Sequence, residues 1–432
     1  MSTAFEQRAR EALGGSPLAE RLAPASEALE RLGGSAEVQH MSSAVLAGLA
    51  RTIAAQPETG AFLSHRAGLL GRLAAANTDT LSEREAELRS WRLNDSDDLE
   101  ESLDSLRLLR RDDTCLAACL HFAGLASFDR VSSFLSTLAE TITRRALDLA
   151  RRGSQVPAFA VIGMGKIAGR EFTYHSDLDL LFLYEGGPDA VADASRVGQR
   201  LVSYLSTMTG AGVAYAVDTR LRPSGRQGML VTSLPAFERY QSEQAQTWEH
   251  VALLRARPIA GSIDEVGEAL ARVHTQVCAR HDAPWPALLE MRRRVESERS
   301  GDDAEEISFK TGAGGLMDVD FLAGGGLLER DAAQLPQVPA VPTMLRAAAA
   351  GPAVEELLAD YATLRRVEAA ARWWAGRAVE ALPTQSLAAL GELLEPGLSG
   401  GALRQQVLST RQRVRAAWDR VIDAGSIAAL EG

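Results

Sequence analysis

The chain has 432 residues, more than one hydrophobic core usually serves, so two or three domains are expected. Its net charge of −11 argues against a nucleic-acid partner, because proteins that grip phosphate backbones need a basic surface. The sequence has no apolar run of membrane-spanning length and no signal-peptide pattern at its start, so we expect a cytoplasmic protein without a membrane partner.

The composition indicates mainly helical structure. Alanine, leucine, arginine and glutamate fill long stretches, and only 5% of the residues are aromatic. These common side chains lose little freedom in a helix. We therefore expect an α+β protein that is mostly helical and carries a small sheet.

Cysteine and lysine are both rare. Cys115 and Cys119 are one helical turn apart in an apolar stretch, without further metal ligands nearby, so buried reduced thiols are favoured over a metal pair. Only two of the 46 basic residues are lysines, Lys166 and Lys310, and both stand close to glycines. A compact ammonium in such a place suits a phosphate group, although two lysines must lie somewhere in any case.

The first 150 residues read as helices. Apolar residues recur at spacings of three, as in Leu103, Leu106 and Leu109. The acidic run 95–98 predicts a capped helix start, and residues 134–150 predict another amphipathic helix. We interpret residues 1–152 as an N-terminal helical domain that docks or braces and carries no catalytic constellation.

The pattern changes at Val156-Pro157, after which short apolar runs bounded by glycine and proline predict strands. The strand candidates are 158–162, 177–184, 213–222 and 229–232, and a helix is expected over 190–208. Strands separated by helices within about 100 residues indicate a compact α/β unit. We assign this central domain to residues 153–262.

The rest of the chain, 263–432, is predicted to be a C-terminal helical domain. Helical patterns cover 353–376 and 400–424, with a glycine-rich stretch at 309–315 and a proline-rich linker at 335–342. Just before it, an amphipathic helix is expected to carry Glu249, His250, Arg255 and Arg257; a solvated or domain-bridging face explains these charges as well as a functional role does.

Three carboxylates form the strongest chemical signal. Asp177 and Asp179 are two residues apart in a strand-like run, so both point to one side. Like charges held that close call for a cation, and Mg²⁺ prefers one or two carboxylates together with water and phosphates. Asp218, on the next strand candidate, would complete a two-metal site, although a solvated strand face remains the alternative.

A glycine-rich loop stands 12 residues before Asp177. Gly163 and Gly165, followed by Lys166 and a short predicted helix, would point backbone N–H groups at a triphosphate. The pattern is neither a Walker A loop nor a dinucleotide fingerprint, because their required glycine and Lys-Ser/Thr spacings are missing. The glycine pattern alone is weak evidence for a nucleotide site. Its closeness to the acids in the sequence makes the evidence more specific.

Five segments in the same order closely resemble the glutamine synthetase adenylyltransferase family: 163–171 (GMGKIAGRE), 176–180 (SDLDL), 217–225 (VDTRLRPSG), 247–250 (TWEH) and 310–321 (KTGAGGLMDVDF). The family is usually a double-length enzyme, in which one half adenylylates a tyrosine of glutamine synthetase and the other removes AMP by phosphorolysis. This chain has the length of one half, and its motifs look more like the adenylylating half.

The resemblance implies a polymerase-β-like nucleotidyltransferase domain flanked by helical domains. It also implies ATP as substrate, two Mg²⁺ ions held by the catalytic residues Asp177, Asp179 and Asp218, glutamine synthetase as the protein substrate, and a PII-type nitrogen-signalling protein as a candidate partner. The expected function is regulation of nitrogen metabolism.

The nucleotide-binding residues expected for such a mechanism lie in four places. The triphosphate would meet the glycine loop, and Arg220 and Arg222, alternating on a strand, could hold phosphate oxygens. Surface ion pairs explain these arginines almost equally well, and Ser176 and Ser224 fit turns as readily as a phosphate contact. The full set is Gly163, Gly165, Lys166, Ser176, Arg220, Arg222 and Lys310.

Three positions depart from the family pattern. Ala168 replaces a glycine, Asp320 stands where glutamate is typical, and Gly324 stands where glutamine is common. The first change is a mild one of packing, whereas the other two leave the role of segment 310–324 open.

Three functions compete at this point. The first is AMP transfer to glutamine synthetase, and the second is its phosphorolytic removal. The third is a non-catalytic regulatory scaffold that binds nucleotide, which the retention of all three acids disfavours. A small-molecule nucleotidyltransferase is disfavoured by the large helical flanks.

Overall fold

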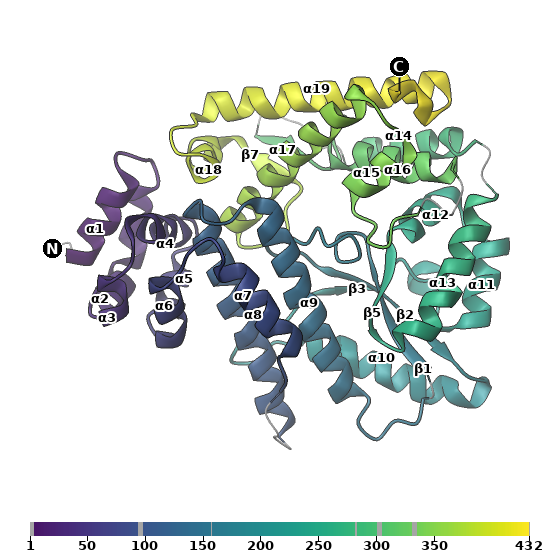
Figure 1. The fold of residues 1–432 in the computed structure, drawn as a ribbon, viewed down its shortest axis with the longest axis horizontal. Helices are drawn as coiled ribbons and strands as arrows, with labels where there is room; N and C mark the ends of the chain where they lie inside the picture. Colours follow the sequence, from purple (N-terminus) through teal and green to yellow (C-terminus); the bar gives the residue numbers. More distant parts are fainter. Residues whose placement is uncertain are drawn as a thin grey trace.

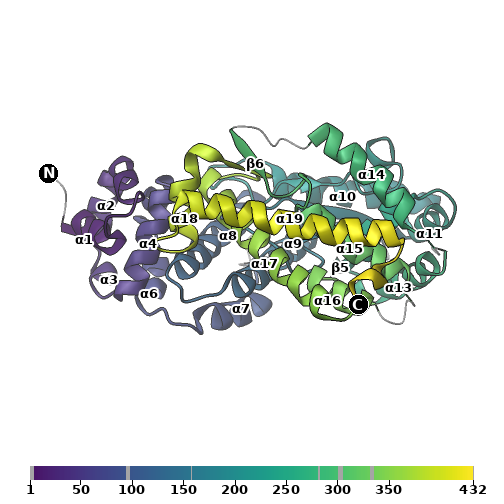
Figure 2. The same ribbon diagram turned by 90° about the horizontal axis from the view of Figure 1, so that it is seen from above.

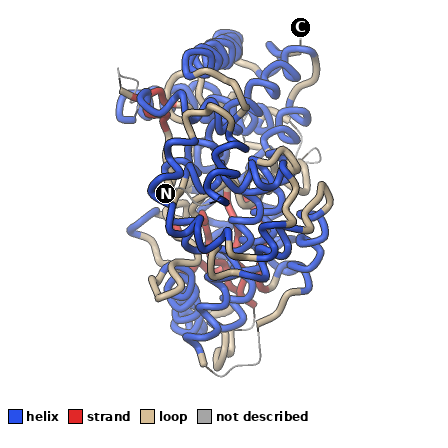
Figure 3. Tube along the Cα trace, turned by 90° about the vertical axis from the view of Figure 1, so that its left-hand side faces the viewer, coloured by secondary structure: helices blue, strands red, loops and turns tan. Residues whose placement is uncertain are grey.

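The computed structural model describes residues 4–93, 98–156, 158–280, 283–299, 305–330 and 335–431. Helices surround one small mixed sheet, which confirms the expected α+β class (Figure 1). In the tube view most of the strands lie inside the molecule with helices on several sides, and a short pair lies near its upper left margin (Figure 3). Within these residues, none of the helices combines the length and apolarity needed to cross a lipid bilayer.

The N-terminal region is helical throughout its described residues, as predicted. Its two longest helices are capped: Asp98 accepts hydrogen bonds from the first backbone N–H groups of α8, and Ser127 does so for α9. Asp95 and Asp97 of the predicted helix start lie outside the described residues. The helices are α1 (Ala4–Leu13), α2 (Ser26–Gly33), α3 (Ala36–Gln39), α4 (Ser43–Ala55), α5 (Glu58–Leu63), α6 (Ala67–Ala74), α7 (Thr80–Ser90), α8 (Leu99–Phe122) and α9 (Phe128–Ala150), with a 3-10 turn η1 (Ala19–Ala25).

The central sheet has the strand order β3-β2-β1-β5, and β4 also pairs with β2. β1 runs antiparallel to β2 and β5, while β3 and β4 run parallel to β2. The strands are β1 (Ala158–Met164), β2 (Leu178–Glu185), β3 (Val217–Asp218), β4 (Val231–Ser233) and β5 (Ala256–Gly261); the intervening elements are η2 (Pro188–Ala190), α10 (Val191–Ser206), η3 (Gly225–Gln227), α11 (Leu234–Glu243) and α12 (Thr247–Leu254).

Three sequence predictions for this region were wrong in detail. The short helix expected after Gly165 is a series of turns through Arg170, because antiparallel β1 and β2 need no helical crossover. The third strand is two residues long instead of covering 213–222, so Arg220 and Arg222 lie in a turn. The helix expected to carry Arg257 ends at Leu254, and Arg257 belongs to β5.

The C-terminal region contains two long helices close to their predicted bounds. α17 covers Pro352–Ala375 and α19 covers Gly400–Ala424. Figure 2 shows α19 running along the length of the molecule. The remaining elements are α13 (Ile263–Cys278), α14 (Trp285–Arg299), β6 (Glu306–Ser308), α15 (Leu316–Leu328), α16 (Val341–Ala348), β7 (Ala381–Pro383), η5 (Thr384–Ser386), α18 (Leu387–Leu394) and η6 (Ile427–Leu430), with β6 and β7 forming a small second sheet.

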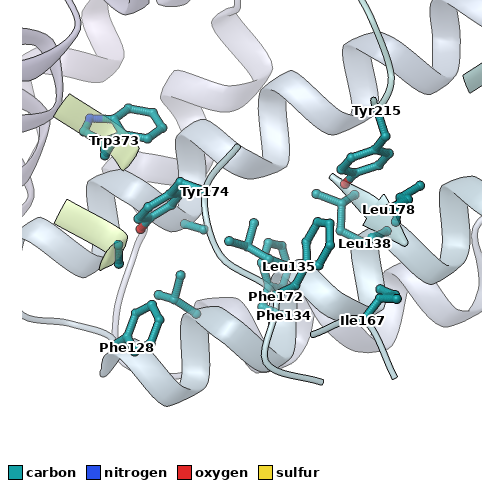
Figure 4. Packing of buried hydrophobic residues seen from close by; sticks show 14 of the residues in the cluster. Phe128, Phe134, Leu135, Leu138, Ile167, Phe172, Tyr174, Leu178, Tyr215 and Trp373 are labelled. Carbon is teal, nitrogen blue, oxygen red and sulfur yellow. The ribbon is translucent and has the colours of Figure 1, made fainter. Parts of the chain in front are cut away.

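One apolar core joins the three regions. Figure 4 shows Phe134 and Leu138 of α9 beside Phe172, which follows the glycine loop, and Leu178 of β2, with Trp373 of α17 at the other end of the cluster. All three cysteines are buried and free, which confirms Cys115 and Cys119 as buried thiols. The chain segments that carry the candidate catalytic groups are therefore anchored from both sides.

Candidate active site

The sheet register brings two of the three acids face to face. Asp179 on β2 is the direct partner of Asp218 on the parallel strand β3. Asp177 stands one residue before β2, where the backbone N–H of Leu178 donates to the carbonyl of Ala216 at 2.9 Å. The predicted convergence of the acids on one sheet edge thus has a structural basis in strand pairing.

The glycine loop lies against Asp179. Gly165 adopts a left-handed backbone with φ of +57°, and a Cβ built there would lie 3.8 Å from an Asp179 carboxylate oxygen. Gly163 serves packing, since a Cβ there would meet Ile167 at 2.9 Å and Ile259 at 3.1 Å. The loop therefore passes directly over the acid without side chains in the way.

Asp179 is hard to ionise in this setting. Burial and the neighbouring Asp218 raise the pKa of its carboxyl to about 6, with Asp177 adding to the repulsion. Lys310 and Lys166 act in the opposite direction. Both lysines of the chain therefore lie within electrostatic reach of the same carboxylate. This agrees with the hypothesis that the two lysines belong to one phosphate-binding site.

Asp218 is held by its own loop. One of its carboxylate oxygens accepts from the Arg220 backbone N–H at 2.8 Å, and the other accepts from Arg220 Nε at 2.7 Å. In the parts of the chain that the structure describes, no three His, Cys, Asp or Glu side chains are grouped as ready metal ligands. At this edge, Arg220 fills the place beside Asp218.

Each lysine is paired with a glutamate from the C-terminal region. Lys166 forms an ion pair with Glu368 of α17, and Lys310 pairs with Glu380, which precedes β7. The first pair is mostly buried, whereas the second is partly open to solvent.

Glu368 sits at the centre of a buried cluster of cations. It is fully buried and also forms ion pairs with Arg365 and Arg372 on the same face of α17. Arg372 donates to the Ser176 hydroxyl at 3.1 Å, so the Ser176 hydroxyl is buried in the protein and lies outside the open cavity at the acids. These three cations together hold the pKa of Glu368 well below its usual range despite its burial.

A second buried network fixes the end of the glycine loop. The Glu171 carboxylate accepts from Arg255, from the Tyr361 hydroxyl at 2.8 Å and from the Val341 backbone N–H at 3.1 Å. Arg255 also donates to Asp320 at 2.7 Å. Asp320, one of the departures from the family pattern, therefore has a structural partner in this chain.

The other departures also have structural settings. Ala168 is fully buried. A Cβ on Gly324 would clash with Val251, so a glutamine has no room there in this packing. The glycine run 312–315 is a turn, and Gly314, with φ of +73°, lies against the backbone of Arg411 in α19.

Two of the three acids, Asp177 and Asp218, open onto a cavity of about 550 Å³, and Asp179 is not among its lining residues. Asp177, Asp218, Arg220 and Arg222 line it. Arg222 also donates to the Thr219 carbonyl at 2.7 Å and to the Gly228 carbonyl at 3.2 Å, so it shapes the turn. Ser224, which has a φ of +60°, belongs to the same turn. A turn position was one of the two roles that the sequence suggested for it.

His175 fixes the chain just ahead of the acids. Its backbone is left-handed, with φ of +51°, an uncommon conformation for a side chain of this size. Gln56 lies at hydrogen-bonding distance, 3.0 Å, and the Trp373 ring packs beside the imidazole. Burial, together with Arg110 and Arg372, lowers the pKa of His175 to about 4, so the ring is neutral near pH 7.

Sequence reasoning missed the glutamates that hold the two lysines. Glu368 lies 202 residues from Lys166 along the chain, and Glu380 lies 70 residues from Lys310. A signal existed in α17, where Arg365, Glu368 and Arg372 recur at helical spacing on the face that also carries Leu364. Charges on an apolar helix face indicate buried ion pairs.

Known proteins resemble this chain over about half of its length. The profile of the glutamate-ammonia ligase adenylyltransferase family matches residues 46–272. Relatives named bifunctional glutamine synthetase adenylyltransferase/adenylyl-removing enzyme include those of Thioalkalivibrio sulfidiphilus (38% identity, covering 52% of this chain and 26% of that protein), Neisseria meningitidis (39%, 56% and 27%) and Pseudomonas aeruginosa (34%, 56% and 28%). The matched region spans about a quarter of the length of these relatives.

The fold, the facing carboxylates beside a glycine loop and these relatives define a protein of the nucleotidyltransferase class. Within that class the match is specific. The chain belongs to the glutamate-ammonia ligase adenylyltransferase family.

Proposed function

We propose that this chain transfers an adenylyl group from ATP to a tyrosine of glutamine synthetase and thereby regulates nitrogen assimilation. Family membership supports the substrate, and the pairing of Asp179 with Asp218 beneath Gly165 is the observation that carries the chemistry. The proposal includes a polymerase-β-like domain over 153–262, helical domains over 1–152 and 263–432, a cytoplasmic location and a PII-type protein as candidate regulator.

Two Mg²⁺ ions held by Asp177, Asp179 and Asp218 are part of the proposal. The donors fit, since carboxylates are ligands that Mg²⁺ prefers, and a cation would offset both the burial and the repulsion from Asp218 that raise the pKa of Asp179. When bound, the ions would neutralise phosphate charge and favour ionisation of the attacking hydroxyl. Asp218 has to exchange Arg220 for this role, which leaves the guanidinium available to the nucleotide.

The two lysines supply the charge that a triphosphate requires. Lys166 and Lys310 both act on Asp179 electrostatically, which supports a role for them in binding phosphates near this acid. Glu368 and Glu380 hold them in place in the absence of nucleotide. The left-handed turn at Gly165 lets the backbone approach the phosphates closely.

The acceptor tyrosine needs help to attack, because its hydroxyl has an ordinary pKa of about 10. Asp218 is positioned at the cavity to accept the hydroxyl proton. The tyrosine oxygen then bonds to the α-phosphorus, and the bond from that phosphorus to the departing pyrophosphate breaks. Such a reaction depends mainly on positioning and charge neutralisation.

A second candidate is the reverse chemistry. The relatives carry both names, adenylyltransferase and adenylyl-removing enzyme, and this chain spans about a quarter of their length. In the removing reaction, inorganic phosphate attacks the AMP group of the modified tyrosine and releases ADP. The same acids and lysines would serve that reaction.

The test is incubation of the protein with Mg²⁺, glutamine synthetase and ATP labelled at the α-phosphate. We expect label on a tyrosine, reduced about a hundredfold or more in Asp179→Asn because a charged group at the reacting centre is lost. Asp264→Asn, at an exposed position in α13, is the matched control and should keep full activity.

Other outcomes decide against transfer. Loss of label from premodified glutamine synthetase on addition of phosphate, without any labelling from ATP, identifies the removing reaction. Absence of both reactions, with a regulatory effect that Asp179→Asn retains, identifies a non-catalytic scaffold.

A further inference from the structure

A second cavity, of about 530 Å³, lies next to the candidate active site. It forms where α5, α8, the loop before β3 and the end of α17 meet. Among its lining residues are Phe62, Arg110, Arg111, His175, Val213 and Trp373. We call it the arginine cavity.

The arginine cavity and the acids share the same two chain segments. His175 lies three residues before β2 and Val213 four residues before β3, and both line the arginine cavity. Two to three residues further along the two segments, Asp177 and Ala216 line the cavity of the acids. Two or three residues of chain span at most about 7–10 Å, so the two cavities lie within roughly the reach of neighbouring residues in a peptide.

Two guanidinium groups in the arginine cavity are held by aromatic rings. Arg111 lies 4.0 Å from the ring centre of Phe62, and Arg110 lies 5.1 Å from that of Tyr215. Arg110 also donates to the Val213 carbonyl at 3.3 Å. Stacking of this kind fixes the planar group and leaves its N–H edge available.

Their charge is not neutralised within the described chain. Among the described residues, neither Arg110 nor Arg111 forms an ion pair, whereas the nearby Arg66 and Arg84 are paired with Asp112 and Asp113. Of the described residues that line the arginine cavity, only Glu58 is acidic. The cavity therefore has an excess of positive charge in a protein whose net charge is −11.

We propose that the arginine cavity binds an acidic segment of the protein substrate beside the acceptor tyrosine. This inference rests on the proposed protein-modifying function. A fork of N–H groups on a planar guanidinium matches a carboxylate, and the half-buried Phe62 ring offers an apolar surface to the rest of a peptide. The cations proposed for the phosphates of ATP, Lys166 and Lys310, do not line the arginine cavity.

The first experiment measures peptide binding by fluorescence anisotropy, with the labelled peptide EEYEE as probe and KKYKK as its counterpart. The full chain should bind the acidic peptide, and Arg111→Glu should weaken that binding about tenfold. Arg111→Lys keeps the charge and loses the planar fork, so its loss should be smaller. Arg420→Glu, at an exposed position in α19, is the control and should bind like the unchanged protein.

The second experiment measures adenylyl transfer. Arg111→Glu should raise the KM for glutamine synthetase about tenfold and leave the KM for ATP within twofold. Added salt should raise the KM for glutamine synthetase of the unchanged protein more than that of the variant, because salt screens the charge of Arg111. Thermal melting of each variant verifies folding. An unchanged KM for glutamine synthetase, equal binding of both peptides, or a raised KM for ATP instead overturns the inference.

The two proposals fail separately. If the unchanged chain binds EEYEE through Arg111 and transfers nothing to glutamine synthetase, the proposed function is wrong and the acidic-peptide site stands. If transfer proceeds and charge reversal at Arg111 has no effect on either experiment, the site is wrong and the function stands.

Discussion

The helices before the central sheet and the helices after it support the site through different chemistry. The N-terminal region packs apolar side chains of α9, such as Phe134 and Leu138, against the segment after the glycine loop. The C-terminal region sends charges into the site, with Glu368 on Lys166 and Glu380 on Lys310. The N-terminal region supports the site by apolar packing, and the C-terminal region supplies the counterions of the lysines proposed to bind phosphate.

The N-terminal region also makes ion pairs with the central region, but they lie away from the candidate acids. Arg170 pairs with Glu85 of α7, and Arg257 pairs with Glu140 of α9. Neither pair includes a residue proposed to contact nucleotide. Changes of the same kind in the two regions should therefore have different effects on ATP binding.

The largest effect is expected for Glu368→Gln. Removal of this buried charge leaves Lys166, Arg365 and Arg372 without their shared counterion, which should cost about 3–5 kcal/mol of unfolding free energy. The KM for ATP should change as well, because Lys166 loses its partner. Urea unfolding and steady-state kinetics measure the two effects.

Glu85→Gln is the matched change on the other side. Glu85 is also buried and pairs with Arg130 and Arg170, so stability should fall while the KM for ATP of the folded protein stays within twofold. An equal change in KM for both variants would remove the distinction between the two regions.

A packing change in the N-terminal region should come next. Gly48 of α4 lies against α8, and a Cβ there would meet the backbone N of Ala123 at 2.7 Å. Gly48→Ala should cost about 1–3 kcal/mol by overpacking, without a change in the KM for ATP. Gly68→Ala in α6 is the control, since its Cβ meets nothing, and should raise stability by about 0.5–1 kcal/mol. Thermal unfolding separates the two variants.

The pH dependence of stability tests the raised pKa of Asp179 in the central sheet. The folded pKa of Asp179 is raised to about 6 from 3.8, so the folded state holds this proton more tightly than the unfolded state. Its contribution is fully present below about pH 4 and is lost as pH rises through 6. In metal-free protein, the stability difference from Asp179→Asn should change over this window, and Mg²⁺ at pH 7 should stabilise only the unchanged protein. A difference that is flat from pH 4 to 7 would contradict the assignment.

The smallest effect on stability is expected for Lys310→Met. The Lys310–Glu380 pair is partly exposed, so its loss should change the unfolding free energy by about 0–1 kcal/mol. If Lys310 contacts phosphate, the KM for ATP should nevertheless rise about tenfold. Stability and ATP kinetics of the same preparation check this contrast, and a proportional change in both would argue for a purely structural lysine.

Local signals in the sequence were enough for the helices and for part of the sheet. α17 and α19 begin and end within a residue of prediction, because Pro352 and Ser399 mark their starts and left-handed Gly376 and Gly425 follow their ends. β5 was missed, since Arg255 and Arg257 in a short run read as an amphipathic helix face. Strand pairing with β1 decides that segment, and pairing is a long-range property.

The candidate site was predictable in its acids and not in their surroundings. Alternation along β2 and a nearby strand were sufficient to expect Asp177, Asp179 and Asp218 at one edge, and the register confirms that Asp179 and Asp218 face each other. The partner of Asp218, Arg220, was instead expected to face the nucleotide from a strand. A two-residue β3 turns the chain early, and no local pattern fixes where a short strand ends.

The ion pairs reaching from α17 bear on where this protein could be divided. Separation of residues 153–262 from residues 263–432 would remove Glu368 from Lys166, and Tyr361 and Asp320 from the Glu171–Arg255 pair. Stranding a buried charge costs several kcal/mol, comparable to the whole stability of many domains. The candidate catalytic segment therefore depends on the C-terminal region: a fusion protein that contains it also needs α15 and α17.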